Sequence, residues 1–62
     1  MKFKDFVELY DNWNGLITVN DDELRPIYCG KTFKVVDERP EFYEKEVVAF
    51  GFYDNELCVR IK

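Results

Sequence analysis

Apolar residues near the start of the chain recur at helical spacing. They stand at i, i+3, i+4, i+7 and i+10, and the residues are Phe3, Phe6, Val7, Tyr10 and Trp13. This period places the apolar side chains on one stripe of a helix and the charged side chains on the other side. We expect an N-terminal helix that ends at Asn14-Gly15, because glycine commonly follows the last turn of a helix.

The next pattern is that of two short strands joined by a polar turn. Leu16–Asn20 is short and rich in β-branched residues, and Asn20–Glu23 has the composition of a turn. A second strand is expected at Leu24–Cys29, closed by Gly30. Pro26 lacks a backbone donor, so this strand should lie at a sheet edge or begin at an irregularity.

The segment from residue 31 to residue 46 leaves its structure open. Lys31–Val36 has an extended pattern, whereas Pro40–Lys45 has the pattern of one or two helical turns begun by proline. The sequence therefore predicts a short helix or a turn before the last two strands.

The C-terminal residues FGFYDNELCVRI predict a hairpin. If Asp54-Asn55 form the centre of a type I′ turn, Tyr53 faces Glu56 and Phe52 faces Leu57. The large apolar residues then share the face that meets the helix. The other face carries glycine, alanine and cysteine, so it should be a shallow strip beside Tyr53 and Arg60, on which another chain could lie.

This order of elements predicts an α+β fold: an N-terminal helix packed on a small antiparallel sheet of three to four strands, with a short helix or turn before the C-terminal hairpin. Sixty-two residues make a single small domain, residues 1–62. No apolar run approaches the ~20 residues of a membrane span, and MKFKDF lacks the apolar core of a secretory signal. We therefore expect a cytoplasmic protein without a membrane partner.

Composition favours surface contacts. The chain has eleven aromatic residues, more rings than so short a chain can enclose, so some should lie outside, where a homodimer or a partner protein would cover them. The net charge of −4 disfavours direct nucleic-acid binding and favours a protein partner with a basic surface.

The sequence offers little chemistry. It contains no histidine, which removes Ser-His-Asp and Cys-His systems. Cys29 and Cys58 are too few for a zinc site, and we expect two reduced thiols, although a bridge between them depends on the fold. Gly30-Lys31-Thr32 lacks the first glycine of a phosphate-binding loop. No catalytic, cofactor-binding or metal-binding residue is predicted, and the chain is not expected to be an enzyme.

The candidate interaction residues are an acidic turn and those aromatic residues that periodicity does not assign to the core. They are Asp21, Asp22, Glu23, Tyr28, Phe33, Phe42, Tyr43 and Tyr53.

Four segments carry a resemblance to known proteins: KDFVELYD, YDNWNG, the GKT after the second predicted strand, and EVVAFGFYDNELCVRI. Together they resemble very small proteins of phages and integrative elements of Gram-positive bacteria. That resemblance implies inhibitors of host defence, including the anti-CRISPR type, which act by occupying a surface. The shared segments reflect fold, so the resemblance transfers no functional residue.

Two functions follow as expectations. The first is a non-enzymatic protein-interaction module of a phage or mobile element, inhibiting a host defence complex in the host cytoplasm by occupying a basic surface. The alternative is a small-molecule or nucleotide-binding module whose pocket lies at a homodimer interface, formed by aromatic residues with Lys31, Lys34 or Arg60.

Overall fold

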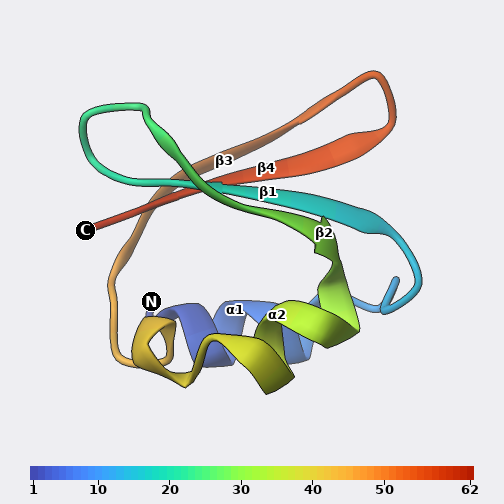
Figure 1. Cartoon of the computed structure of the whole chain (residues 1–62), viewed down its shortest axis with the longest axis horizontal. Coiled ribbons are helices and arrows are strands. Elements are labelled where there is room, and N and C mark those ends of the chain that lie inside the picture. Colours follow the sequence, from blue (N-terminus) through green and yellow to red (C-terminus); the bar gives the residue numbers. More distant parts are fainter.

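A layer of helices covers one face of a four-stranded sheet (Figure 1). The computed structural model describes all residues from 1 to 62. The elements are α1 (Phe3–Leu9), β1 (Leu16–Asn20), β2 (Pro26–Lys31), α2 (Thr32–Glu38), the 3-10 helix η1 (Pro40–Phe42), β3 (Val47–Tyr53) and β4 (Glu56–Ile61). The α+β class, the N-terminal helix and the short helical segments before the last hairpin are confirmed.

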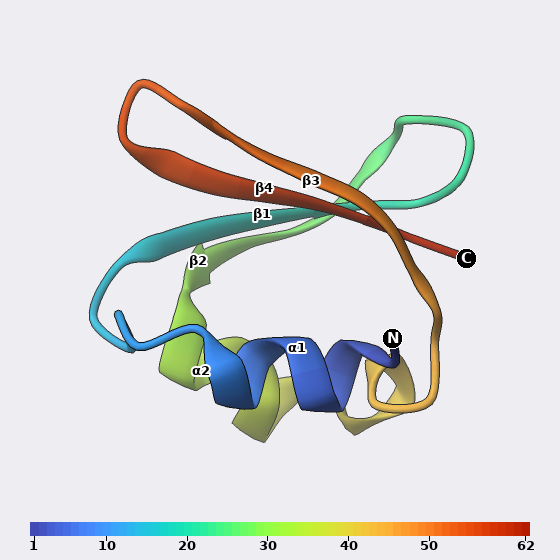
Figure 2. The ribbon, with the colours of Figure 1, turned by 180° about the vertical axis from the view of Figure 1, so that it is seen from behind.

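The sheet is mixed, with strand order β2-β1-β4-β3. Each hairpin is antiparallel, as expected, but the central strands β1 and β4 are parallel. The connection through α2 and η1 carries the chain from the β2 edge to the opposite edge, so β4 returns beside β1. The two hairpin turns consequently lie at opposite ends of the sheet (Figure 2).

The two central strands supply most of the core. Every second residue of β1 and β4 faces the helices and is at most 3% exposed; these residues are Ile17, Val19, Leu57, Val59 and Ile61. The helical layer packs onto them with Phe3 and Val7 from α1, Val35 from α2 and Phe42 from η1. The strict alternation follows from the two-residue period of a strand that is covered on one face.

The first helix is shorter than its apolar stripe predicts. It ends at Leu9, and Tyr10 is already extended, with ψ 115°. Trp13 therefore lies in the following loop and is 39% exposed. Gly15 does not adopt the left-handed conformation expected after a helix. A Cβ on Gly15 would lie 2.5 Å from Asn12 Nδ2, so any other residue there would displace the Asn12 side chain.

That loop is held by the start of α2. The Thr32 amide donates to the Gly15 carbonyl at 2.9 Å, and the Phe33 amide donates to the Trp13 carbonyl at 3.1 Å. The buried Thr32 hydroxyl also donates to Gly15 at 3.1 Å. Tertiary hydrogen bonds thus satisfy the first donors of α2 and fix the path of the chain after α1.

The extended interpretation of Lys31–Val36 is wrong, because Thr32–Glu38 is helical. Thr32 and Val35 are buried and Val36 is half-buried, which is the i, i+3, i+4 spacing of a helix face. Burial here overrides the strand preference of β-branched residues. Pro40 begins the 3-10 helix, as its position predicted.

The C-terminal hairpin has the predicted register from Tyr53–Glu56 to Ala49–Arg60. Asp54 and Asn55 have φ values of 53° and 67°, consistent with a type I′ turn. The register shifts by one residue between Val47 and Ala49, and the Val47 amide donates to the Met1 carbonyl at 2.8 Å. The N-terminal residues therefore border only the beginning of β3.

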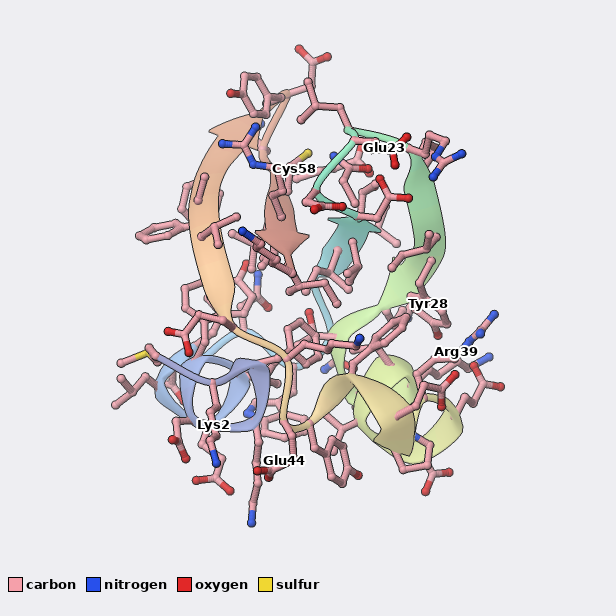
Figure 3. The ribbon with its side chains drawn as sticks, turned by 90° about the vertical axis from the view of Figure 1, so that its left-hand side faces the viewer. Lys2, Glu23, Tyr28, Arg39, Glu44 and Cys58 are labelled. Atoms are coloured by element: carbon pink, nitrogen blue, oxygen red, sulfur yellow. The ribbon has the colours of Figure 1, made fainter.

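Ion pairs join the two ends of the helical layer. The Met1 amine pairs with Glu46, and Lys2 Nζ donates to Glu44 at 2.6 Å (Figure 3). That hydrogen bond raises the pKa of Lys2 and lowers the pKa of Glu44. No helix has the length and apolar character needed to cross a bilayer.

Candidate interaction surfaces

One face of the sheet has no helix over it, and we call it the open face. All helices lie on the other side (Figures 1 and 2). The strand registers place on the open face the residues that alternate with the core positions. These residues are Leu16, Thr18, Asn20, Pro26, Cys29, Lys31, Ala49, Gly51, Tyr53, Glu56, Cys58 and Arg60.

A hollow of about 160 Å³ lies on the open face between Leu24 and Tyr53. Its floor includes Ala49, Gly51 and Cys58, whose small side chains leave the strands shallow, as the sequence predicted. The Tyr53 ring leans over Gly51, since a Cβ on Gly51 would lie 3.4 Å from that ring. The hollow is therefore open to solvent and bordered by two large exposed side chains.

Leu24, beside this hollow, has an unfavourable backbone conformation. Its φ is 67°, a left-handed value that leucine rarely adopts, and its side chain is 62% exposed. Left-handed backbone at a non-glycine residue costs about 1–3 kcal/mol, and such residues cluster at functional sites. The β1–β2 turn thus presents an apolar side chain at an energetic cost.

The acidic turn divides into one structural residue and two accessible ones. The Asp21 carboxylate accepts hydrogen bonds from the amides of Glu23 and Arg25, both at 2.9 Å, and from Arg25 Nε at 3.1 Å. These bonds, above all the one from the Arg25 amide, lower the pKa of Asp21. Asp22 and Glu23 are exposed, Glu23 pairs with Arg25 at 3.2 Å, and Figure 3 shows Glu23 away from the helices.

The predicted aromatic residues separate between the two sides of the sheet. Phe42 is only 6% exposed and packs edge-on against Phe3, with ring centroids 5.8 Å apart, so this predicted interface residue belongs to the core. Tyr43 is half-buried and its hydroxyl donates to the Val36 carbonyl. Tyr53 lies on the open face and is 67% exposed.

Tyr28 and Phe33 lie on the helical side. The Tyr28 hydroxyl donates to Glu38 Oε1 at 2.9 Å, and Arg39 lies over its ring at 5.8 Å (Figure 3). The pKa of Tyr28 is raised, chiefly because its hydroxyl is removed from water and secondly because it donates to Glu38. Phe33 is 41% exposed on α2. Only Tyr53 and the acidic turn, among the predicted residues, border the open face.

The two cysteines are separate thiols. Thr18 of β1 pairs with Cys29 on one side and with Cys58 on the other, and its hydroxyl donates to Cys29 Sγ at 3.6 Å. Two strand spacings, about 9–10 Å, exceed the Cα separation of roughly 4–7 Å that a disulfide spans. The structure therefore excludes the intramolecular bridge that the sequence left open.

The basic residues considered for ligand binding do not gather. Lys31 pairs with Leu16 and Arg60 with Asn20, at opposite ends of β1. Lys34 lies on α2, in the helical layer. No three acidic or cysteine side chains converge on a position suited to a metal ion.

A second surface, missed by the sequence analysis, is an apolar groove between α1 and β3. Its lining residues are Met1, Phe6, Leu9, Tyr10, Phe50, Phe52 and Leu57, and its volume is about 350 Å³. We call it the α1–β3 groove. A neighbouring depression of about 420 Å³ continues it along Val47, Val48 and Ala49.

The two phenylalanines of β3 sit at the rim of this groove. Phe50 contacts Phe6 with ring centroids 5.0 Å apart, and Phe52 contacts Tyr10 at 6.2 Å. They nevertheless remain 62% and 58% exposed. A seven-residue helix is only about 10 Å long, whereas a seven-residue strand spans about 23 Å, so α1 cannot cover β3. No pattern in the sequence indicated this groove, because the apolar stripe predicted a helix that continued to Asn14-Gly15.

No protein-family model, curated protein or solved structure matches the chain.

Proposed function

We propose that this chain is a non-enzymatic protein-interaction module whose open face docks onto a basic surface of a larger protein. The observation that carries the proposal is Leu24, which combines a left-handed φ of 67° with 62% exposure beside the hollow. A turn selected only for stability would place glycine or asparagine at this position. A partner that buries Leu24 compensates for its exposure.

Charge supports a basic partner. The β1–β2 turn carries Asp22 and Glu23, the β3–β4 turn carries Asp54, and β4 begins with Glu56, so carboxylates border the open face at both ends. The bases on this side are Arg60 and Lys31 in the strands and Arg25 in the β1–β2 turn, where it pairs with Asp21 and Glu23, so the carboxylates remain in excess. Opposite charge speeds association and disfavours acidic competitors.

The resemblance to small proteins of phages and integrative elements supports a biological setting for this activity. In that setting the chain acts in the host cytoplasm and inhibits a defence complex by covering a basic surface. Inhibition of this kind requires only occupancy, and the small residues of the open face let a partner approach the strands closely.

The test compares protein capture from the lysate of a Gram-positive host by four tagged chains: the unmodified chain and the variants Leu24→Gly, Glu23→Lys and Glu41→Lys. Glu41 is the matched control, because its side chain is 57% exposed, against 68% for Glu23, and it lies in the helical layer. Leu24→Gly and Glu23→Lys should lose the captured protein, whereas Glu41→Lys should retain it.

Added salt should release the captured protein, because charge attraction across an exposed surface is screened within about 10 Å at 0.1 M. Equal capture by all four chains would contradict the proposal. So would a rise in melting temperature with nucleotides alone, which would favour the ligand-binding alternative.

A further inference from the structure

The two edges of the sheet differ in their protection against strand pairing. The β2 edge begins with Pro26, has a register irregularity, and ends with Lys31, all of which discourage pairing with another chain. The opposite edge is β3, Val47–Tyr53, which contains no charged residue and no proline. Its irregularity lies before Ala49, so Ala49–Tyr53 presents a regular, uncharged and unpaired edge.

We propose that a second copy of this chain pairs with this edge. The two β3 strands run antiparallel about a two-fold axis near Gly51, which joins the two sheets into one. In this register Phe50 of each copy faces Phe52 of the other on the groove side. Directly opposed aromatic residues in antiparallel strands stabilise the pairing.

The area of exposed apolar surface is sufficient for such a contact. Phe50, Phe52 and Val48 are 62%, 58% and 45% exposed, and across the groove Met1 and Leu9 are 56% and 72% exposed. At roughly 150–250 Å² for a large side chain, these five present about 500–600 Å² per copy. Complete burial of these side chains in two copies would cover at most about 1,000–1,200 Å², the size of weak, transient interfaces. The contact is therefore a weak, reversible dimer.

Charge favours the antiparallel arrangement. The beginning of β3 is bordered by three positive groups, the Met1 amine, Lys2 and Lys45, against the carboxylates of Glu44 and Glu46. The end of β3 is bordered by Asp54 and Glu56 without a base. A two-fold axis brings the beginning of each strand to the end of the other, so each positive end meets a negative one.

The dimer contact and the proposed partner site lie on opposite faces of the sheet, and Phe50 of β3 borders both the hollow and the groove. The groove residues face the helical side, and a two-fold axis perpendicular to the sheet leaves both open faces exposed on the same side. Dimerisation and partner binding are consequently separable by experiment.

Sedimentation equilibrium tests the proposal with three chains: the unmodified protein, Phe50→Lys and Leu24→Lys. Phe50 and Leu24 are both 62% exposed, so the second variant controls for placing a charge at an equally exposed apolar site. From about 10 µM to about 1 mM, a range suited to small interfaces, the unmodified protein should shift from monomer to dimer. Phe50→Lys should weaken dimerisation about 100-fold, because both copies lose an aromatic contact. Leu24→Lys should leave it unchanged.

Amide hydrogen exchange locates the contact. Exchange within Ala49–Tyr53 should slow with increasing protein concentration, while exchange in β2 should not change. A monomer at every concentration, equal weakening by Leu24→Lys, or concentration-dependent protection only outside β3 would each overturn the proposal. Circular dichroism checks that Phe50→Lys folds; if it does not, Phe52→Lys replaces it, since Phe52 is 58% exposed.

Discussion

Replacing Phe42 decides between its predicted role at an interface and its place in the core. The ring is 6% exposed, meets Phe3 edge-on, and lies 5.8 Å from the Arg39 guanidinium. We expect Phe42→Ala to destabilise the monomer severely. Tyr53→Ala is the comparison, because Tyr53 is also an aromatic interface candidate but is 67% exposed.

The magnitude follows from the buried area. A phenylalanine that buries nearly all of roughly 200 Å² loses about 5 kcal/mol at 25 cal/mol per Å², and measured Phe→Ala changes in cores lie at about 3–5 kcal/mol. Tyr53 buries about one third of its ring, which gives about 1.5 kcal/mol. A chain of 62 residues has a total stability of about 3–9 kcal/mol.

Thermal and urea unfolding followed by circular dichroism measure the difference. Phe42→Ala should lower the melting temperature by about 20 °C or more, or leave the chain unfolded at 25 °C, because 1 kcal/mol shifts a domain of this size by about 4–8 °C. Tyr53→Ala should lower it by about 10 °C or less. A melting temperature of Phe42→Ala within a few degrees of that of the unmodified protein would contradict the core position of Phe42.

The pKa of Asp21 is lowered in the folded protein, so its carboxylate stabilises the fold above the ordinary pKa of 3.8, and this contribution is lost as pH falls through the lower folded value. Urea titrations should therefore show that Asp21→Asn is less stable than the unmodified protein at pH 7 and loses less stability on acidification. Leu24→Gly should raise the free energy of unfolding by about 1 kcal/mol while weakening partner capture, because it relieves left-handed strain and removes an apolar contact. Ellman's reagent should titrate two thiols without prior reduction, with the exposed Cys29 reacting faster than the half-buried Cys58; one mole or less would contradict the separation of the two cysteines by Thr18.

Local sequence patterns predicted those helices and strands in which the spacing of apolar residues alone indicates which side chains are buried. The C-terminal hairpin is specified twice, by alternating apolar residues and by Asp54-Asn55, whose side chains tolerate the left-handed conformation that the turn requires. A slip of one residue would turn Leu57 and Val59 to the open face. The register was therefore recoverable from sequence alone.

Long-range contacts decided what the sequence left open or placed wrongly. The apolar stripe continues to Trp13, but α1 ends at Leu9 because the following loop hydrogen-bonds to the start of α2. Lys31–Val36 has the composition of a strand, yet the need to bury Thr32 and Val35 makes it a helix. In both cases the deciding contacts join segments that are far apart in the sequence.

The candidate surfaces depend on the order of strands in the sheet. Alternation correctly put Phe50 and Phe52 on the face that meets the helix, but it could not show that β3 is an edge strand beyond the reach of α1. The same holds for Leu24, whose left-handed φ is a property of the folded turn. The composition predicted that some aromatic rings are exposed, but Phe42 was wrongly assigned to the exposed rings.

The two surfaces together predict a bivalent molecule. A dimer joined at β3 would present two open faces on the same side of one sheet, so a partner displayed at high density on a surface would engage both at once. The second contact then forms at an effective concentration in the millimolar range, which raises apparent affinity without any new contact. Phe50→Lys should therefore release the chain faster from a densely immobilised partner, yet bind the same partner with unchanged affinity at low density. Equal affinity loss at both densities would show that Phe50 itself touches the partner, and that the groove and the open face are not independent sites.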